Sequence, residues 1–170
     1  MIILGYLFTV LNYTCYCLGR FMKKKTSILA MSLIAKIFLS IGLYCMGSLS
    51  GAYIHAIALG MLIIVNLKEN LQKRWILGYV FFQVLYLFVL YNTFIGISSI
   101  LVTITATITL YSNWFLPPQK MRLSATLNSM LCMLYHITIK NWAGLLEIFA
   151  LFSNVTAYIK YRKKLRKKHK

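Results

Sequence analysis

The sequence predicts an all-helical, polytopic membrane protein with seven spanning helices. Three observations lead to this fold class: the composition, the number of apolar runs and the position of the charges. Of the 170 residues, 60% are hydrophobic and only 12% are charged, which is roughly half the charged share of an average soluble domain. Apolar runs recur along the whole chain, too many for one water-soluble core. Nearly all basic residues lie between these runs.

The apolar runs predict the elements in order. The first ends at the basic cluster around Lys24, the second at the uncharged turn GSLSG, and the third at KENLQKR. The fourth ends before Asn92, the fifth before PPQKMR, and a short turn near Trp142 joins the sixth to the seventh. The runs are long enough to cross a hydrocarbon core of about 30 Å, provided that the shorter ones tilt little. The predicted helices cover residues 1–19, 27–46, 52–67, 75–91, 94–115, 123–138 and 142–159.

These helices form one predicted transmembrane bundle over residues 1–160, and residues 160–170 form a basic tail. The connections after helices one, three, five and seven are basic, whereas the others are short and hold only Lys140. Because basic loops stay in the cytoplasm, we expect the C-terminus there and the N-terminus outside. The net charge of +17 would indicate nucleic acid in a soluble protein. Here its position indicates anionic lipid headgroups as the partner, and no nucleic acid.

Seven helices also divide as three, one and three, which would give the two triplets the same orientation. Both halves contain a basic entry, a helix, a short turn followed by a glycine (Gly51, Gly144), and a helix that ends in basic residues. Parallel repeats about an axis along the membrane normal are a known plan of transporters. The sequence therefore predicts a possible 3+1+3 arrangement of two parallel three-helix repeats.

Glu147 is the one carboxylate inside a hydrophobic segment. A carboxylate at that depth is costly, so it usually faces the protein interior and has a partner. His136 lies about as far before the last turn as Glu147 lies after it, and Asn154 falls on the same helical face as Glu147. These residues predict a site across the last hairpin. The alternative is that they hold the helices in register by hydrogen bonds.

Lys36 lies near the centre of the second predicted helix, too deep to reach the interface easily. Its natural partner would be Glu147, although it could equally hold an anionic group of a solute. A lysine that is neutral when buried, or a tilted helix, is the alternative. We therefore expect a substrate-binding set of four residues from three helices: Lys36, His136, Glu147 and Asn154. Further amides within the apolar runs, Asn12, Gln83 and Asn128, are singly more typical of interhelical hydrogen bonds. Together with His55 they would suit a hydrated site near the midplane.

The sequence offers no set of residues for catalysis, so we expect no enzyme. It contains no Asp, no paired carboxylates and no glycine-rich phosphate loop. Cys15, Cys17, Cys45 and Cys132 lack the spacing of a metal site, so we expect neither a metal nor a cofactor. The tryptophans at helix ends, Trp75, Trp114 and Trp142, are typical of an aromatic belt at the interfaces.

The segment 128–163 resembles the YgjV-type family of small bacterial inner-membrane proteins. The resemblance rests on Tyr135-His136, Trp142-Ala143-Gly144, Glu147, Asn154 and the exit Ile159-Lys160-Tyr161-Arg162. It implies a multi-pass location in the bacterial inner membrane. It also implies a distant likeness to the seven-helix plan of SWEETs, vitamin-precursor permeases and PQ-loop transporters. The dipeptide Pro118-Gln119 lies at the end of helix five, outside the position of a PQ-loop motif.

We therefore expect a small transporter or permease for a small polar solute, in which two three-helix halves rock around a midplane site. The main alternative is a non-transporting scaffold or accessory subunit that binds anionic lipid or a partner through its basic tail. A membrane-embedded enzyme that acts on lipid is a third alternative, without a catalytic set to support it. An oligomer is compatible with either of the first two.

Overall fold

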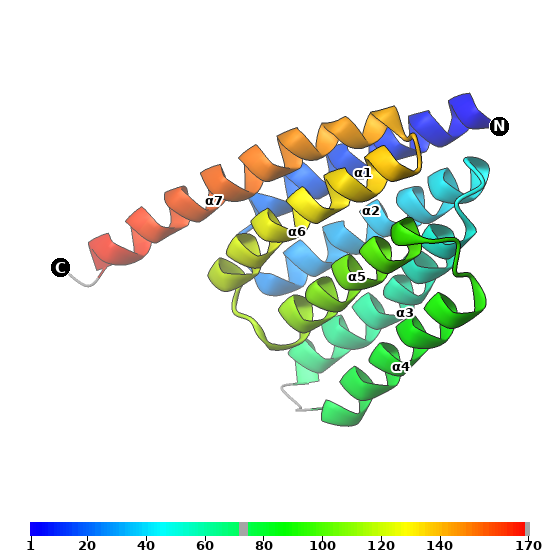
Figure 1. Cartoon of the computed structure of the whole chain (residues 1–170). Coiled ribbons are helices and arrows are strands. Elements are labelled where there is room, and N and C mark those ends of the chain that lie inside the picture. Colours follow the sequence, from blue (N-terminus) through cyan, green and yellow to red (C-terminus); the bar gives the residue numbers. More distant parts are fainter. Residues whose placement is uncertain (72–74, 169–170) are drawn as a thin grey trace.

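The computed structural model describes residues 1–71 and 75–168, with side chains up to residue 162. Within these ranges the regular structure is helical, and a 3-10 turn, η1 (Trp142–Leu146), precedes the last helix (Figure 1). The helices are α1 (Ile2–Arg20), α2 (Lys25–Cys45), α3 (Leu49–Leu71), α4 (Ile76–Asn92), α5 (Ile97–Phe115), α6 (Pro118–Thr138) and α7 (Glu147–Lys168). The predicted all-helical class is confirmed for the described part of the chain.

Six of the helices form a closed ring. In this ring α1 packs on α2, α2 on α3, α3 on α5, α5 on α6 and α6 on α7, and α7 returns to α1. The remaining helix, α4, lies outside the ring against α3 and α5 (Figure 1). Consecutive helices are antiparallel, so α3 with α5 and α7 with α1 form two parallel interfaces. These two interfaces separate the unit α1–α3 from the unit α5–α7.

The antiparallel order gives the bundle two different ends. We call the end where α1, α3 and α5 finish the basic end, and the opposite one the neutral end. Lys23, Lys24, Lys120 and the C-terminal part of α7 belong to the basic end, whereas the N-terminus and Lys140 belong to the neutral end. The first residue of the chain and the C-terminal end of α7 therefore lie at opposite ends of the bundle (Figure 1).

The outer surface of the bundle is apolar, as in a protein surrounded by lipid. Large apolar side chains are exposed on every helix; examples are Leu7, Ile37, Ile63, Val84, Ile104, Leu127 and Phe152. Four segments are long and apolar enough to cross a membrane by themselves: α1, α2, α3 and Trp142–Arg162. The apolar helix α4 is shorter, with 17 residues. Helices α5 and α6 contain several polar side chains that turn inward, such as Thr105, Asn113 and Ser129, which are buried.

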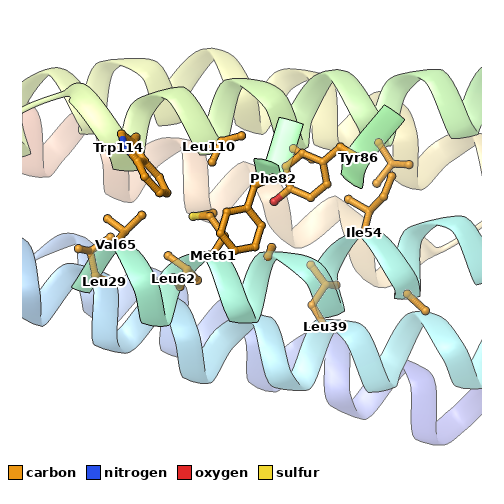
Figure 2. Close-up of a cluster of buried hydrophobic side chains, with 14 of the residues drawn as sticks. Leu29, Leu39, Ile54, Met61, Leu62, Val65, Phe82, Tyr86, Leu110 and Trp114 are labelled. Atoms are coloured by element: carbon orange, nitrogen blue, oxygen red, sulfur yellow. The ribbon is translucent and has the colours of Figure 1, made fainter. Parts of the chain in front are cut away.

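The apolar core lies between α2, α3, α4 and α5 (Figure 2). Met61 and Leu62 of α3 lie at its centre, and Phe82 of α4 packs between them and Trp114. Trp114 is 1% exposed, which contradicts the expected place of this residue in an interfacial belt. Gly78 explains the difference, because a Cβ there would lie 2.8 Å from the Trp114 ring. The glycine lets α4 cover the indole.

Helix ends differ from the predicted bounds where capping and packing extend a helix beyond its apolar run. Helix α6 begins at Pro118 instead of residue 123, because proline is well suited to the first helical position. Helix α3 continues to Leu71, beyond the predicted end at residue 67. Helix α7 runs through the tail to Lys168, so the described part of the tail is a continuation of the last helix.

The two corners at the end of α2 and of α6 have the same backbone geometry. Gly47 (φ 79°) and Lys140 (φ 54°) each adopt the left-handed conformation one residue after the helix cap. In both corners the next N–H bonds to a carbonyl five residues back, Ser48 to Leu43 at 3.0 Å and Asn141 to His136 at 2.9 Å. This Schellman motif satisfies the last carbonyls of the helix. Each corner turns the chain within three residues.

Candidate functional site

The ring helices enclose a buried cavity of about 40 Å³, which is room for about three water molecules. It extends from the level of Arg20 near the basic end to the level of His136 near the neutral end. Every ring helix contributes polar side chains to its wall, for example Asn12 (α1), Lys36 (α2), His55 (α3), Thr105 (α5), Asn128 (α6) and Glu147 (α7). The candidate site therefore lies at the centre of the ring and involves all six of its helices, not only the last hairpin.

Lys36 reaches the cavity from the middle of α2, and its Nζ lies 3.2 Å from Nδ1 of His55. A charged ammonium can only donate, so Nδ1 of a neutral His55 accepts and the ring proton lies on Nε2. The expected partner, Glu147, is not in contact. Among the described residues the ion pairs of carboxylates involve Glu69 alone. Lys36 is in mid-helix whereas Glu147 begins α7 at the neutral end, so their depths differ.

Glu147 occupies the first position of α7, where the helix dipole favours a negative charge. The residue is 9% exposed, and Oε2 has no hydrogen-bond partner among the described residues. The same holds for the hydroxyl of Tyr13 and for Oδ1 of Asn128, which also line the cavity. Buried polar atoms are costly without partners. Three of them around one polar cavity indicate that water or a polar solute occupies it.

His136 is held by the α6–α7 corner. Its Nδ1 lies 3.1 Å from the amide nitrogen of Asn141, whose backbone N–H also bonds to the His136 carbonyl. Because an amide NH₂ only donates, Nδ1 accepts and the remaining ring nitrogen carries the proton. Gly144 lies directly against the imidazole, where a Cβ would overlap it. His136 and Glu147 thus line the same cavity, with no hydrogen bond between them among the described contacts.

Asn154 lies two turns beyond Glu147 on α7 and is fully buried. Seven residues displace it by about 10 Å along the helix axis, and it is not part of the cavity wall. Both polar atoms of its amide lack partners among the described residues. The structure therefore brings Lys36, His136 and Glu147 to one cavity and places Asn154 in the neighbouring helix packing.

Sequence reasoning missed several residues of the cavity wall. Arg20 was assigned to a basic loop cluster, yet it is 7% exposed, lines the cavity and lies 4.1 Å above the Tyr16 ring. Thr105 and Thr109 of α5 also face inward. Their spacing of four residues on one helical face was a usable signal. Arg20 and Tyr16 lie near the C-terminal end of α1 and line the cavity. Composition does not reveal that this end of the helix faces inward.

A cluster of contacts joins α1 and α7 at the basic end. Arg122, 1% exposed, donates from Nε to the Arg20 carbonyl (3.1 Å) and from Nη2 to the Met22 carbonyl (2.7 Å). Tyr161 donates from its hydroxyl to the Phe21 carbonyl (2.6 Å), and the Arg122 guanidinium lies 4.4 Å above its ring. Cationic donors are favourable at a helix C-terminus. We call this the α1–α7 clasp.

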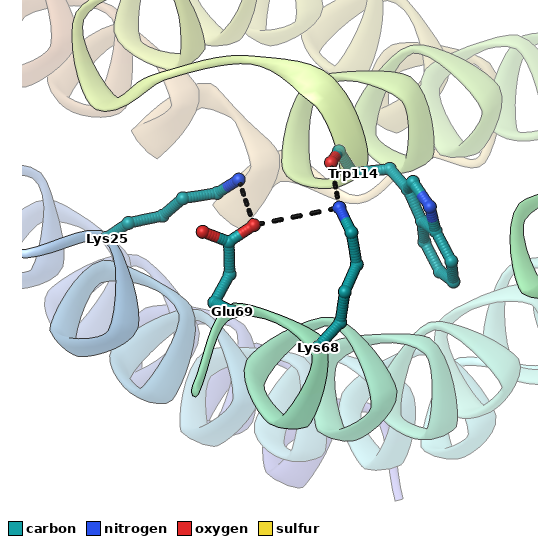
Figure 3. A network of polar contacts seen from close by, with 4 residues as sticks. All are labelled: Lys25, Lys68, Glu69 and Trp114. Carbon is teal, nitrogen blue, oxygen red and sulfur yellow. Dashed lines mark hydrogen bonds and ion pairs between the residues drawn. The ribbon is translucent and has the colours of Figure 1, made fainter. Parts of the chain in front are cut away.

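A second cluster joins α3 and α5 at the same end (Figure 3). Lys68 donates from Nζ to the Trp114 carbonyl at the end of α5. Glu69 lies 3.7 Å from Lys68 and 2.7 Å from Lys25, so it links α2 to the same cluster. We call this the α3–α5 clasp. Each of the two parallel interfaces is therefore closed by side chains at the basic end.

An apolar outer surface, several membrane-length apolar helices and a polar interior define an integral, polytopic α-helical membrane protein. The family model of the Imp-YgjV bacterial inner membrane proteins matches residues 2–165, so the chain belongs to this family. The resemblance drawn from the segment 128–163 is thereby confirmed over nearly the whole chain. Among the curated proteins and the solved structures, nothing matches the chain.

Proposed function

We propose that this protein is a small permease that carries a polar solute across the bacterial inner membrane. One observation carries the proposal: a polar cavity lies between two three-helix units and is lined by all six of their helices. Solute sites of transporters lie at such interfaces between repeats. The proposal assigns binding and passage to the cavity, and no covalent chemistry.

Equivalent positions in the two units support a repeat relationship between α1–α3 and α5–α7. Helices α2 and α6 both have 21 residues, and the offset between their first residues, from 25 to 118, recurs elsewhere. It relates Gly47 to Lys140 in the two corners. It also relates cavity-lining residues of the first unit to cavity-lining residues of the second, as in Asn12 with Thr105 and Lys36 with Ser129.

The two clasps obey the same offset. Lys68 and Tyr161 are equivalent donors, and Trp114 and Phe21 supply the equivalent acceptors, with donor and acceptor exchanged between units. This is the relation expected of a two-fold axis along the bundle. It supports a mechanism in which the two units rock about the cavity and the clasps release at the basic end. The cavity of the described conformation has room for about three waters, so passage of a larger solute requires the two units to move apart.

We further propose that all seven helices span the membrane, with the basic end in the cytoplasm and the N-terminus outside. The support is the segregation of basic residues to one end of the bundle, since cytoplasmic ends carry the excess of Lys and Arg. The cavity-lining polar residues of α5 and α6 are shielded by their neighbours in the ring. Anionic lipid headgroups are the proposed partners of the basic end.

The first test is thermal stability of the purified protein in mild detergent with a panel of small polar solutes. A solute that binds the folded state at 100 times its Kd adds about 2.7 kcal/mol of stability. The expected result is an upward shift in Tm that disappears in Glu147→Gln or Lys36→Met while the Tm without solute is retained. Lys120→Met, an exposed lysine of α6 outside the cavity, is the matched control and should keep the shift.

The rival proposal is a scaffold that docks anionic lipid or an acidic partner through its tail. The observation in its favour is that α7 continues to Lys168, past the helices of the ring (Figure 1). A scaffold predicts stabilisation by anionic lipid through the tail and none by any solute. It also predicts that Glu147→Gln and Lys36→Met retain the function of the protein in cells. Stabilisation by anionic lipid with none by any solute would contradict the permease proposal. Retained function of Glu147→Gln and Lys36→Met in cells would also contradict it.

A further inference from the structure

The cavity holds two side chains of opposite formal charge that do not meet. Glu147 presents an unpartnered Oε2 from α7, and Lys36 presents Nζ from α2, with His55 as its hydrogen-bond partner among the described residues. The two groups are not within ion-pair distance, since the described ion pairs all involve Glu69. The helices hold the positive and negative groups apart across one small polar space.

Other polar atoms around the cavity also lack partners. Oδ1 of Asn128, which lines a smaller adjoining pocket together with Lys36 and His55, is an acceptor without a donor, as is Oε2 of Glu147. Nε of Arg20 is a donor without an acceptor, and Arg20 lines the cavity nearer the basic end. The cavity thus offers free acceptors for a cationic donor, and free donors for an anionic acceptor. The polar hydroxyl of Tyr13 serves either partner.

Resting on the proposed transport function, we propose that the solute is a small zwitterion that carries a primary amino group and a carboxylate, that is, a small amino acid. Its amino group donates to Glu147, and its carboxylate accepts from Lys36. One solute then compensates both buried charges. Burial of either charge without a partner costs much free energy. A monocarboxylate or a simple amine compensates only one of the two.

The volume favours a small solute. A cavity of about 40 Å³ has room for roughly three waters, so a larger solute requires a larger separation of the two units. Bulky side chains would have to displace buried residues such as Leu39 and Leu62 from the cavity wall. The smallest amino acids, glycine and alanine, are therefore the preferred probes over aromatic or long-chain ones.

The test is uptake into liposomes that contain the purified protein. Radiolabelled alanine is compared with propionate, which lacks the amino group, and with ethylamine, which lacks the carboxylate. We expect alanine uptake to exceed both by at least about tenfold, because a site with buried polar groups rejects an analogue that leaves them unpaired. Glu147→Gln should remove the preference for alanine over propionate, and Lys36→Met the preference for alanine over ethylamine. Lys120→Met should retain both preferences.

The outcomes separate this inference from the permease proposal. Uptake of propionate or ethylamine at the rate of alanine in the unaltered protein would overturn the zwitterion and leave transport intact. Uptake of a neutral solute such as a sugar, with no uptake of alanine, would do the same. A protein that keeps its Tm in liposomes and moves no solute of the panel would overturn both proposals together.

Discussion

Lys68 and Tyr161 make matching contacts that close the bundle at its basic end. Each donates a side-chain hydrogen bond to a backbone carbonyl at the C-terminus of a helix from the other three-helix unit. Lys68 reaches α5 from α3, and Tyr161 reaches α1 from α7. The two bonds therefore join the same two units on opposite sides of the central cavity.

We predict that loss of the Lys68 and Tyr161 hydrogen bonds, one from each clasp, makes the cavity more accessible from the basic end. Cys132 lines the cavity and serves as a reporter once Cys15, Cys17 and Cys45 are replaced by alanine. In the double variant Lys68→Met, Tyr161→Phe, a charged thiol reagent should label Cys132 at least about tenfold faster, since the opening equilibrium shifts by the two lost hydrogen bonds at roughly 1 kcal/mol each. Reagent added from the neutral side should give no such increase in the labelling rate of Cys132. An unchanged rate from the basic side would contradict the prediction that these bonds limit access to the cavity.

Arg122 should be the most sensitive charged residue at the basic end. Arg122→Lys keeps the charge but loses the planar fork that bonds to two carbonyls and covers the Tyr161 ring. We expect a loss of roughly 2–4 kcal/mol in the free energy of unfolding, measured by denaturant unfolding in detergent micelles. The exposed neighbour Lys120→Met should change it by less than about 0.5 kcal/mol. Equal losses would mean that the fork geometry is not what stabilises this end.

Gly144 should be intolerant of even a methyl group. In Gly144→Ala the added Cβ overlaps the His136 ring, so the imidazole or the corner must move, at a cost of about 1–3 kcal/mol of stability. Gly60 of α3 provides the matched control, because its nearest neighbour to a new Cβ is Phe82 at 3.8 Å. Gly60→Ala should be neutral or stabilising, as expected for alanine in a helix interior. A Tm for Gly144→Ala at or above that of Gly60→Ala would refute this account.

The proposed topology predicts the side of the membrane on which each end lies. A fluorescent protein fused after Lys170 should fluoresce, and an alkaline phosphatase fused there should be inactive, because the proposed topology places the basic end in the cytoplasm. Lys140 is exposed at the neutral end. A cysteine introduced there should react, in cells with a permeabilised outer membrane, with a thiol reagent that does not cross the inner membrane. The opposite pattern would invert the bundle.

Much of the fold could be predicted from hydropathy, since the apolar runs correspond to the helices and the basic clusters to one end of the bundle. The bounds were less accurate where local chemistry decides them, as at Pro118 and in the helical tail. The order of helices around the ring, with α4 outside, could not be predicted, because it depends on packing between segments far apart in the sequence. The seven spans and the repeat stay predictions.

The candidate site could be predicted in part. Lys36, His136 and Glu147 stand out because polar residues are costly inside an apolar run, and all three line the cavity. Asn154 shares the helical face of Glu147 but lies deeper along α7, which periodicity alone does not distinguish. Arg20 was missed because a basic residue at a run's end is usually solvated, and only the tertiary structure reveals that it is buried.

Helix α7 begins at Glu147 and continues without a break to Lys168. At 1.5 Å per residue, its 22 residues form a rod about 33 Å long. The buried carboxylate and the basic tail thus lie at the two ends of one helix. As long as the rod stays straight, any displacement of the tail along its axis moves Glu147 by the same distance. The proposed attachment of the tail to lipid headgroups would therefore fix the depth of the carboxylate in the cavity.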